Sequence, residues 1–220
     1  QNIHDFAWFA DKKWLVRKDT IAVPGSDNIV TAYSCYNPRH GKGWDKSMEW
    51  IKDAVRGYSK AVGPYPYKTV KAVEGALSAG GGMEYPTVTV IAASDNEEIV
   101  RVAIVHEVGH NWFYGMLGSN ERMYPWMDEG INSFYEGKLA PPVKKKSWKD
   151  GNSLAYAAFA ATHHLTPADT TITVMPEINT LVDIYAKAAY MLGWLEAYMG
   201  KDRFDAAMQD YFRTWQYKHP

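Results

Sequence analysis

The chain has 220 residues, of which 46% are hydrophobic and 22% charged, and its formal net charge at pH 7 is −1. These values are ordinary for a globular protein and exclude an intrinsically disordered chain. The nearly balanced charge means that the chain has no excess of basic residues, so we expect neither nucleic acid nor an anionic membrane as a partner. The basic run Lys144–Lys146 follows two prolines and is predicted to be a solvated loop, with a partner-binding patch as the alternative.

A single cysteine, Cys35, excludes an internal disulfide and a thiolate zinc cage. It lies in a strand-like stretch and is predicted to be a small, half-buried residue. This cysteine usage fits either side of a membrane, and no apolar run is long enough to span one. The chain opens at Gln1 without a methionine and stops at Pro220 without a tail, which suggests a piece of a longer polypeptide whose flanking domains are missing.

The first part of the chain predicts a small sheet and one helix. Runs of aromatic and β-branched residues indicate strands, and apolar residues at helical spacing indicate a helix. The predicted strands cover residues 3–23, 29–36, 67–74 and 87–93, and the helix covers residues 44–61. The turn residues Pro24–Asn28 separate the first two runs, which predicts a hairpin. The glycine-rich stretch 80–86 predicts either an edge strand that could take up an extended peptide or a flexible turn.

A longer helix is predicted after the last strand. Ser94–Glu97 has the pattern of a capping box, and Gly115–Gly118 is predicted to end the helix, which would then cover residues 96–117. The side chains predicted to bury one side of it are Ile99, Val102, Ala103 and Ile104.

The rest of the chain predicts helices alone, over residues 126–136, 149–163, 181–199 and 202–217. Thr180 with Asp183 is predicted to cap the third of these helices, and Gly200 to end it. His163 and His164 end the second helix and are predicted as partners of its C-terminal dipole rather than as metal ligands. A sheet followed by helices indicates an α+β protein.

The motif H-E-x-x-H covers His106–His110 in the long predicted helix. Helical spacing places the two histidines one turn apart on the same face, where both imidazoles can bind one metal ion. Glu107 then lies beside the ion and can take a proton from metal-bound water. A zinc ion with an open position needs a third protein ligand, and Glu129 is the obvious carboxylate. We therefore predict one zinc ion, although cobalt or manganese could occupy the same ligands.

Two alternatives remain open around this motif. Glu136 lies seven residues after Glu129, on the same face of the helix predicted there, so it could hydrogen-bond a ligand imidazole from outside the metal site. It could equally be a surface glutamate. The two histidines could also be a purely structural pair on a helix that packs into the core.

Four separate motifs resemble those of the aminopeptidase N-like zinc peptidases, which are gluzincins. The first is His106–His110 together with Glu129, and the second is Gly81–Glu84, which resembles the exopeptidase signature G-x-M-E-N. Tyr185–Ala188 is similar to the family's Y-x-K-G segment, and Trp215–Pro220 adds a fourth likeness. The motifs follow the family's order, and the resemblance covers nearly the whole chain.

The resemblance implies a thermolysin-like, two-lobed catalytic domain. Residues 1–118 would form a lobe with a small mixed sheet, including the last strand of a missing N-terminal β-domain, the edge strand and the metal-binding helix. Residues 119–220 would form an all-helical lobe. Together they would make one fragment of a catalytic domain.

The resemblance also implies roles for the site residues. The two histidines and Glu129 would hold zinc, and the motif glutamate would be the general base. Tyr185 would donate a hydrogen bond to the oxyanion formed when water attacks the scissile carbonyl. Glu84 would hold the free α-amino group of the substrate, with Gly81, Gly82 and Met83 at the first subsite.

Two positions depart from the family pattern: Tyr85 replaces the usual Asn, and Ala188 replaces the usual Gly. The expected function is that of a zinc aminopeptidase that removes N-terminal residues from peptides with a free amino group. An endopeptidase of the same metal class is one alternative. A peptide-binding module that uses its edge strand, with weak catalysis or none, is another.

Overall fold

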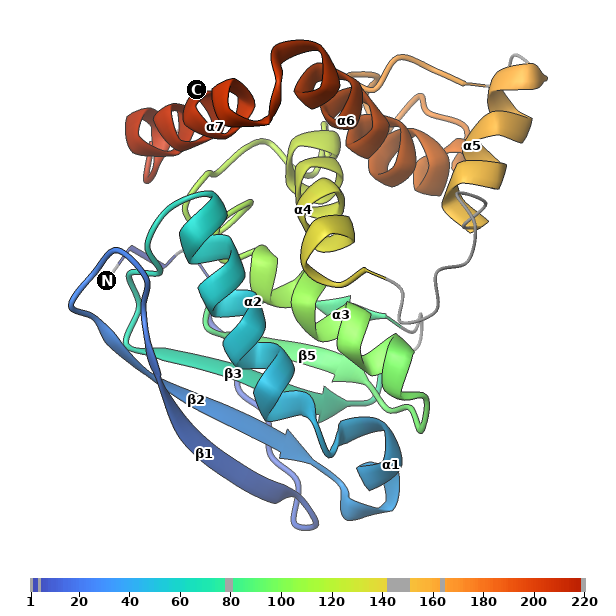
Figure 1. Cartoon of the computed structure of the whole chain (residues 1–220). Helices are drawn as coiled ribbons and strands as arrows, with labels where there is room; N and C mark the ends of the chain where they lie inside the picture. The colour runs from blue at the N-terminus through green and yellow to red at the C-terminus, as the bar shows by residue number, and fades with distance from the viewer. Residues whose placement is uncertain (1, 4, 78–80, 142–150, 163–164, 219–220) are drawn as a thin grey trace. The chain divides into compact units, whose positions relative to one another are not determined.

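The computed structural model describes residues 2–3, 5–77, 81–141, 151–162 and 165–218, without the side chains of 151–155. The chain forms two compact units, Gln1–Gly115 and Met116–Pro220, and each is described by itself (Figure 1). The predictions for Lys144–Lys146 and for His163 and His164 lie outside the described residues.

The first unit contains a five-stranded sheet with the strand order β1-β2-β3-β5-β4. Its strands are β1 (Leu15–Ala22), β2 (Ile29–Tyr36), β3 (Thr69–Gly75), β4 (Gly82–Met83) and β5 (Val88–Ala92). The β1–β2 and β4–β5 pairs are antiparallel, and the β2–β3 and β3–β5 pairs are parallel. The predicted hairpin is therefore confirmed, and the glycine-rich stretch supplies a short strand at the edge of the sheet.

Helices cover one face of this sheet (Figure 1). The helical segments of the unit are η1 (Pro38–His40), α1 (Gly41–Trp44), α2 (Ser47–Ala61) and α3 (Glu97–Gly109). Ser34 on β2 points to this face, because its hydroxyl lies 2.6 Å from the hydroxyl of Ser47 on α2. Its neighbour Cys35 therefore points to the opposite face. There Cys35 is buried with Val73 and Val90, and burial raises the pKa of its thiol.

The prediction of strands over residues 3–23 is correct only for Leu15–Ala22, since the described residues before position 15 form no strand. Phe9 and Trp14 pack against the Cys35 face of the sheet. Phe6 and Trp8 are 88% and 76% exposed. Part of this segment thus covers a face of the sheet without pairing as a strand. Aromatic residues are common in both situations, so composition alone does not tell them apart.

Three predictions about α3 need correction. Its N-cap is Asn96, whose side chain accepts hydrogen bonds from the backbone amides of Glu98 and Ile99, so the Ser94–Glu97 capping box is wrong. Ile99 is 56% exposed, and the buried apolar residues are Val100, Ile104, Val105 and Val108. The helix ends at Gly109 because the amide of Asn111 turns back to the carbonyl of Val108.

In the second unit the described elements are all helical. They are η2 (Trp126–Gly130), α4 (Ile131–Leu139), α5 (Gly151–Ala161), η3 (Glu177–Asn179), η4 (Thr180–Lys187), α6 (Ala188–Met199) and α7 (Lys201–Trp215). Two predicted helices, 126–136 and 181–199, each begin with a π-helical segment. These segments carry Glu129 and Tyr185. π-Helical turns are rare and often lie at functional sites. A mixed sheet with helices, followed by helices, confirms the α+β prediction.

The predicted cap formed by Thr180 and Asp183 is wrong, since η4 has no side-chain cap. Asp183 is instead buried, and its carboxylate accepts hydrogen bonds from the amide and hydroxyl of Thr166 at 2.8 and 2.6 Å and from the side-chain amide of Asn179 at 3.1 Å. Gly200 ends α6 as predicted, with a φ of 82° that favours glycine.

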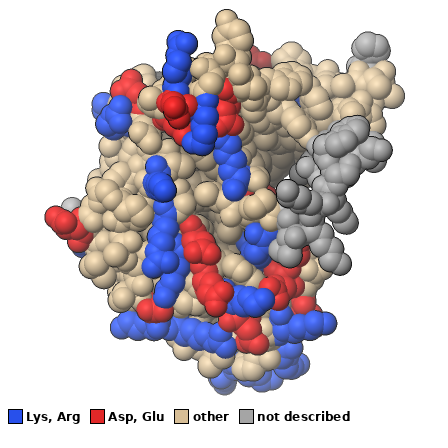
Figure 2. All heavy atoms as spheres, in the orientation of Figure 1, with Lys and Arg blue, Asp and Glu red and all other residues tan. Residues whose placement is uncertain are grey.

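The face drawn in Figure 2 carries Lys and Arg side chains interspersed with Asp and Glu side chains. Ion pairs between such side chains occur among the described residues, for example between Lys46 and Glu97 at 2.8 Å. Among the described residues, no helix has both the length and the apolar character needed to cross a bilayer.

Candidate metal centre

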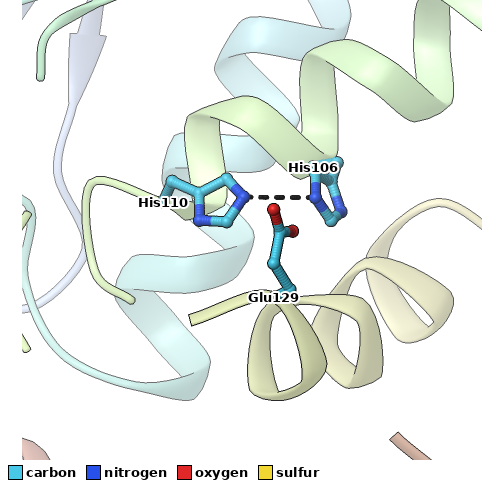
Figure 3. Close-up of side chains that lie close together, drawn as sticks. All are labelled: His106, His110 and Glu129. Carbon is cyan, nitrogen blue, oxygen red and sulfur yellow. Dashed lines mark hydrogen bonds between the residues drawn. The ribbon is translucent and has the colours of Figure 1, made fainter. Parts of the chain in front are cut away.

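His106 and His110 lie one helical turn apart near the end of α3, as predicted (Figure 3). Their Nε2 atoms are 3.1 Å apart, and the ring centroids are 4.8 Å apart with the planes at 80°. A tetrahedral zinc ion bound through both nitrogens at about 2.05 Å would set them roughly 3.3 Å apart. The two imidazoles therefore already converge at nearly the spacing that one zinc ion needs.

The ring of His110 is oriented by the turn that follows α3. Its Nδ1 lies 3.0 Å from the carbonyl oxygen of Phe113. A carbonyl can only accept a hydrogen bond, so Nδ1 carries a proton, and in the neutral ring the lone pair that a metal needs is then on Nε2. The contact of Phe113 with His110 was not predictable from the sequence, because it arises where the helix ends earlier than predicted.

Edge strand β4 brings Glu84 to the same part of the first unit. One donor atom from each of Glu84, Glu107 and His110 lies within 4.8 Å of the other two. Glu107 is only 6% exposed. The carboxylates of Glu84 and Glu107 are therefore near neighbours. Glu84 belongs to the predicted amine-binding segment and Glu107 to the H-E-x-x-H motif, and the two motifs by themselves do not show this proximity.

Gly82 on β4 lies directly against Glu107. A Cβ atom at position 82 would lie 2.4 to 2.5 Å from Cγ, Cδ and Oε1 of that glutamate. Real contacts are not this short, so a side chain at this position would move the carboxylate. The absence of a side chain at Gly82 thus keeps the motif glutamate in place.

With the general-base role that the resemblance implies for Glu107, we expect Gly82→Ala to lower kcat/KM roughly 100-fold, since a displacement of about 1 Å at such a group has effects of that size. The atoms in the way belong to the end of a side chain, so the fold should survive, with little change in melting temperature. Steady-state kinetics with thermal denaturation test this. Gly193→Ala is the matched control, since nothing lies within 4 Å of its added Cβ. Equal activity of the two variants would contradict the expectation.

In the second unit, Glu129 and Tyr185 lie on segments that touch. Gly130 follows Glu129 directly, and a Cβ atom at position 130 would lie 2.3 Å from Cβ of Ala188 and 2.6 Å from the carbonyl oxygen of Ile184. The π-helical turn of Glu129 therefore packs against the end of η4, which carries Tyr185. Ala188, a departure from the family's glycine, fills space that Gly130 leaves open. No sequence signal pointed to Gly130.

Glu129 and Tyr185 are both half-buried, as is Glu136 on α4. Glu136 lies after the π-helical turn rather than on one continuous helix with Glu129. Residue spacing alone therefore does not place Glu136 on the same face as Glu129, and the role of Glu136 beside a ligand imidazole stays a prediction.

Comparison with known proteins identifies the family. The model of the peptidase family M1 domain matches residues 54–219. Aminopeptidase M1-B from Oryza sativa subsp. japonica is 25% identical over 195 residues, which are 79% of this chain and 21% of that protein. Aminopeptidase N from Homo sapiens is 27% identical over 139 residues, 58% of this chain and 14% of that protein. The chain thus spans about a fifth or less of the length of these two relatives.

Solved structures share the fold. The M1 zinc metallopeptidase from Deinococcus radiodurans superimposes with a TM-score of 0.70 at 20% identity, covering 93% of this chain and 46% of that one. Native yeast LTA4 hydrolase gives a TM-score of 0.66 at 16% identity, covering 86% of this chain and 32% of that one. The structural matches show the fold, and the family model together with the aminopeptidase relatives confirms the resemblance to aminopeptidase N-like gluzincins. With the family model matched from residue 54 to residue 219 of 220, this chain belongs to peptidase family M1.

Proposed function

We propose that the protein is a zinc-dependent aminopeptidase that hydrolyses N-terminal residues from peptides. The observation that carries this proposal is the grouping in the first unit, where two imidazole nitrogens converge 3.1 Å apart. Beside them, donor atoms of Glu84 and Glu107 lie within 4.8 Å of His110 and of each other. One carboxylate suits proton transfer and the other suits binding of an ammonium group, which together describe a peptidase that acts at a free amino terminus.

In this proposal Glu129 is the third zinc ligand. Two histidines with one glutamate are a donor set typical of catalytic zinc, which keeps a fourth position open. The resemblance to the family's motif, two histidines followed by a later glutamate, supports the assignment, and Figure 3 draws the three residues. The single zinc ion is part of the proposal.

A zinc ion bound there would supply Lewis acidity to the scissile carbonyl and to water. Glu107 accepts a proton from the attacking water, and its burial beside Gly82 keeps its carboxylate in one orientation. Tyr185 donates its hydroxyl proton in a hydrogen bond to the oxyanion that develops on the carbonyl oxygen. Glu84 pairs with the substrate's ammonium group and so fixes which peptide bond is cut.

The test is an assay of the zinc-loaded, full-length protein with a free-amine peptide and its N-acetylated twin. Acetylation removes the positive charge that Glu84 would bind, so we expect kcat/KM to fall at least about 100-fold for the acetylated peptide. Equal cleavage of both peptides would refute the aminopeptidase assignment and favour an endopeptidase. Cleavage of neither would favour a peptide-binding module.

A further inference from the structure

Asn111 follows His110 directly and connects the end of α3 to a distant loop. Its side chain is only 2% exposed. Its Nδ2 donates a hydrogen bond to the carbonyl of Val108 at 2.9 Å, and its Oδ1 accepts one from the backbone amide of Thr87 at 3.0 Å. Both ends of this buried amide are thus used, one on the helix that carries the two histidines and one on the loop after Glu84.

Thr87 has an unusual backbone conformation. Its φ is 66°, in the left-handed region, which β-branched residues rarely adopt. This conformation costs energy and persists only where the surrounding structure holds it. The residue ends the loop between β4 and β5, where the amide of Val88 donates to the carbonyl of Tyr85 at 3.0 Å. The hydrogen bond from Thr87 to Asn111 is one interaction that holds this conformation in place.

The loop between β4 and β5 contains Glu84. On the side before Glu84, β4 pairs with β5 through Gly82 with Ile91 and Met83 with Val90. On the side after Glu84, the amide of Thr87 is fixed to Asn111. The short segment between these two attachments places Glu84 beside the residues of α3, since donor atoms of Glu84, Glu107 and His110 lie within 4.8 Å of one another.

We propose that Asn111 is a positioning residue that aligns the amine-binding loop with the metal-binding helix. It acts through the Thr87 amide on Glu84, and so sets the distance between the carboxylate that holds the substrate's amino group and the atoms that cleave the peptide bond. This inference rests on the proposed function, and it adds a residue that belongs to none of the motifs discussed above.

The test uses Asn111→Leu, which has a similar volume but no hydrogen-bonding group, in the zinc-loaded, full-length protein. Loss of a buried hydrogen bond that holds a strained loop should raise KM for a free-amine peptide about tenfold. We expect a smaller change in kcat and an unchanged zinc content. A KM equal to that of the wild type would overturn the inference.

Thr87→Gly provides a rescue experiment. Glycine adopts a positive φ without strain, so the loop then depends less on Asn111. Thr87→Gly alone should behave like the wild type, and in the double variant Asn111→Leu/Thr87→Gly the KM should return most of the way to the wild-type value. If Asn111 only stabilised the end of α3, Thr87→Gly would restore nothing, and that result would overturn the inference.

Amide hydrogen exchange tests the coupling without any assay of activity. The Thr87 amide should be protected in the wild type and exchange at least about tenfold faster in Asn111→Leu. Rapid exchange of this amide in the wild type would overturn the inference, even if Asn111→Leu did not fold. A wild-type protein that cleaves no peptide, yet protects this amide, would refute the proposed function while leaving the loop attachment supported.

Discussion

Replacing Glu107 with glutamine is expected to reduce kcat by about 1,000-fold or more, because the amide cannot accept the proton of the attacking water. The two side chains have nearly the same shape, so glutamine fits the buried position against Gly82. Glu107 is not a proposed zinc ligand. Zinc content should therefore stay at one ion per chain, measured by metal analysis beside the turnover rate.

Glu97→Gln is the matched control for that experiment. It is the same substitution on the same helix, in the first turn of α3, where Glu97 is exposed and pairs with Lys46. The control should keep wild-type turnover and lose less than about 1 kcal/mol of stability. Unchanged turnover in Glu107→Gln would remove this glutamate from the mechanism. A wild type and variant that are both inactive would favour peptide binding without catalysis.

Replacing Glu84 with glutamine is expected to raise KM for free-amine peptides roughly 100-fold, because a desolvated ammonium group loses its charged partner. The slow cleavage of the N-acetylated peptide should not change, so selectivity for a free amino terminus should largely disappear. The ratio of kcat/KM for the two peptides measures this effect directly.

Glu177→Gln is the control for the Glu84 variant, because Glu177 is exposed on η3. It should keep the wild-type ratio of the two peptides. If Glu84→Gln kept that ratio as well, the amine-binding role would be wrong, and another group would have to recognise the end of the substrate.

The sequence predicted those features that depend on local spacing. His106 and His110, the C-cap residue of α3, lie one turn apart because four residues make about one turn of an α-helix, so their predicted spacing held although the helix ends at Gly109 rather than at residue 117. The β1–β2 hairpin was predictable for the same reason, since the turn residues separate two extended runs. Errors in element boundaries did not affect either relationship.

The sequence did not predict features that depend on contacts between distant segments. The tight contact of Gly82 with Glu107 arises only when the edge strand packs against α3, and the glycine-rich stretch by itself predicted either an edge strand or a flexible turn. Asn111 resembled one more residue of a long helix, whereas its amide crosses to Thr87. The side of α3 that is buried also differs from the predicted side, because Ile99 fits the helical spacing of apolar residues but faces solvent.

The π-helical segments around Glu129 and Tyr185 had no sequence signal either. Both were predicted as ordinary α-helix, and the structure shows Gly130 closely packed against Ile184 and Ala188, a contact between distant segments. A wider turn changes the direction in which later side chains point. This is why the relation between Glu129 and Glu136 could not be inferred by counting residues.

The most direct test of the central claim is anomalous scattering at the zinc edge from crystals of the zinc-loaded protein. We expect one peak per chain at about 2.0 to 2.2 Å from Nε2 of His106, Nε2 of His110 and a carboxylate oxygen of Glu129. A map with no peak between the two imidazoles, or with zinc bound by other side chains while Glu129 points elsewhere, would contradict the proposed metal centre and the peptidase mechanism that depends on it.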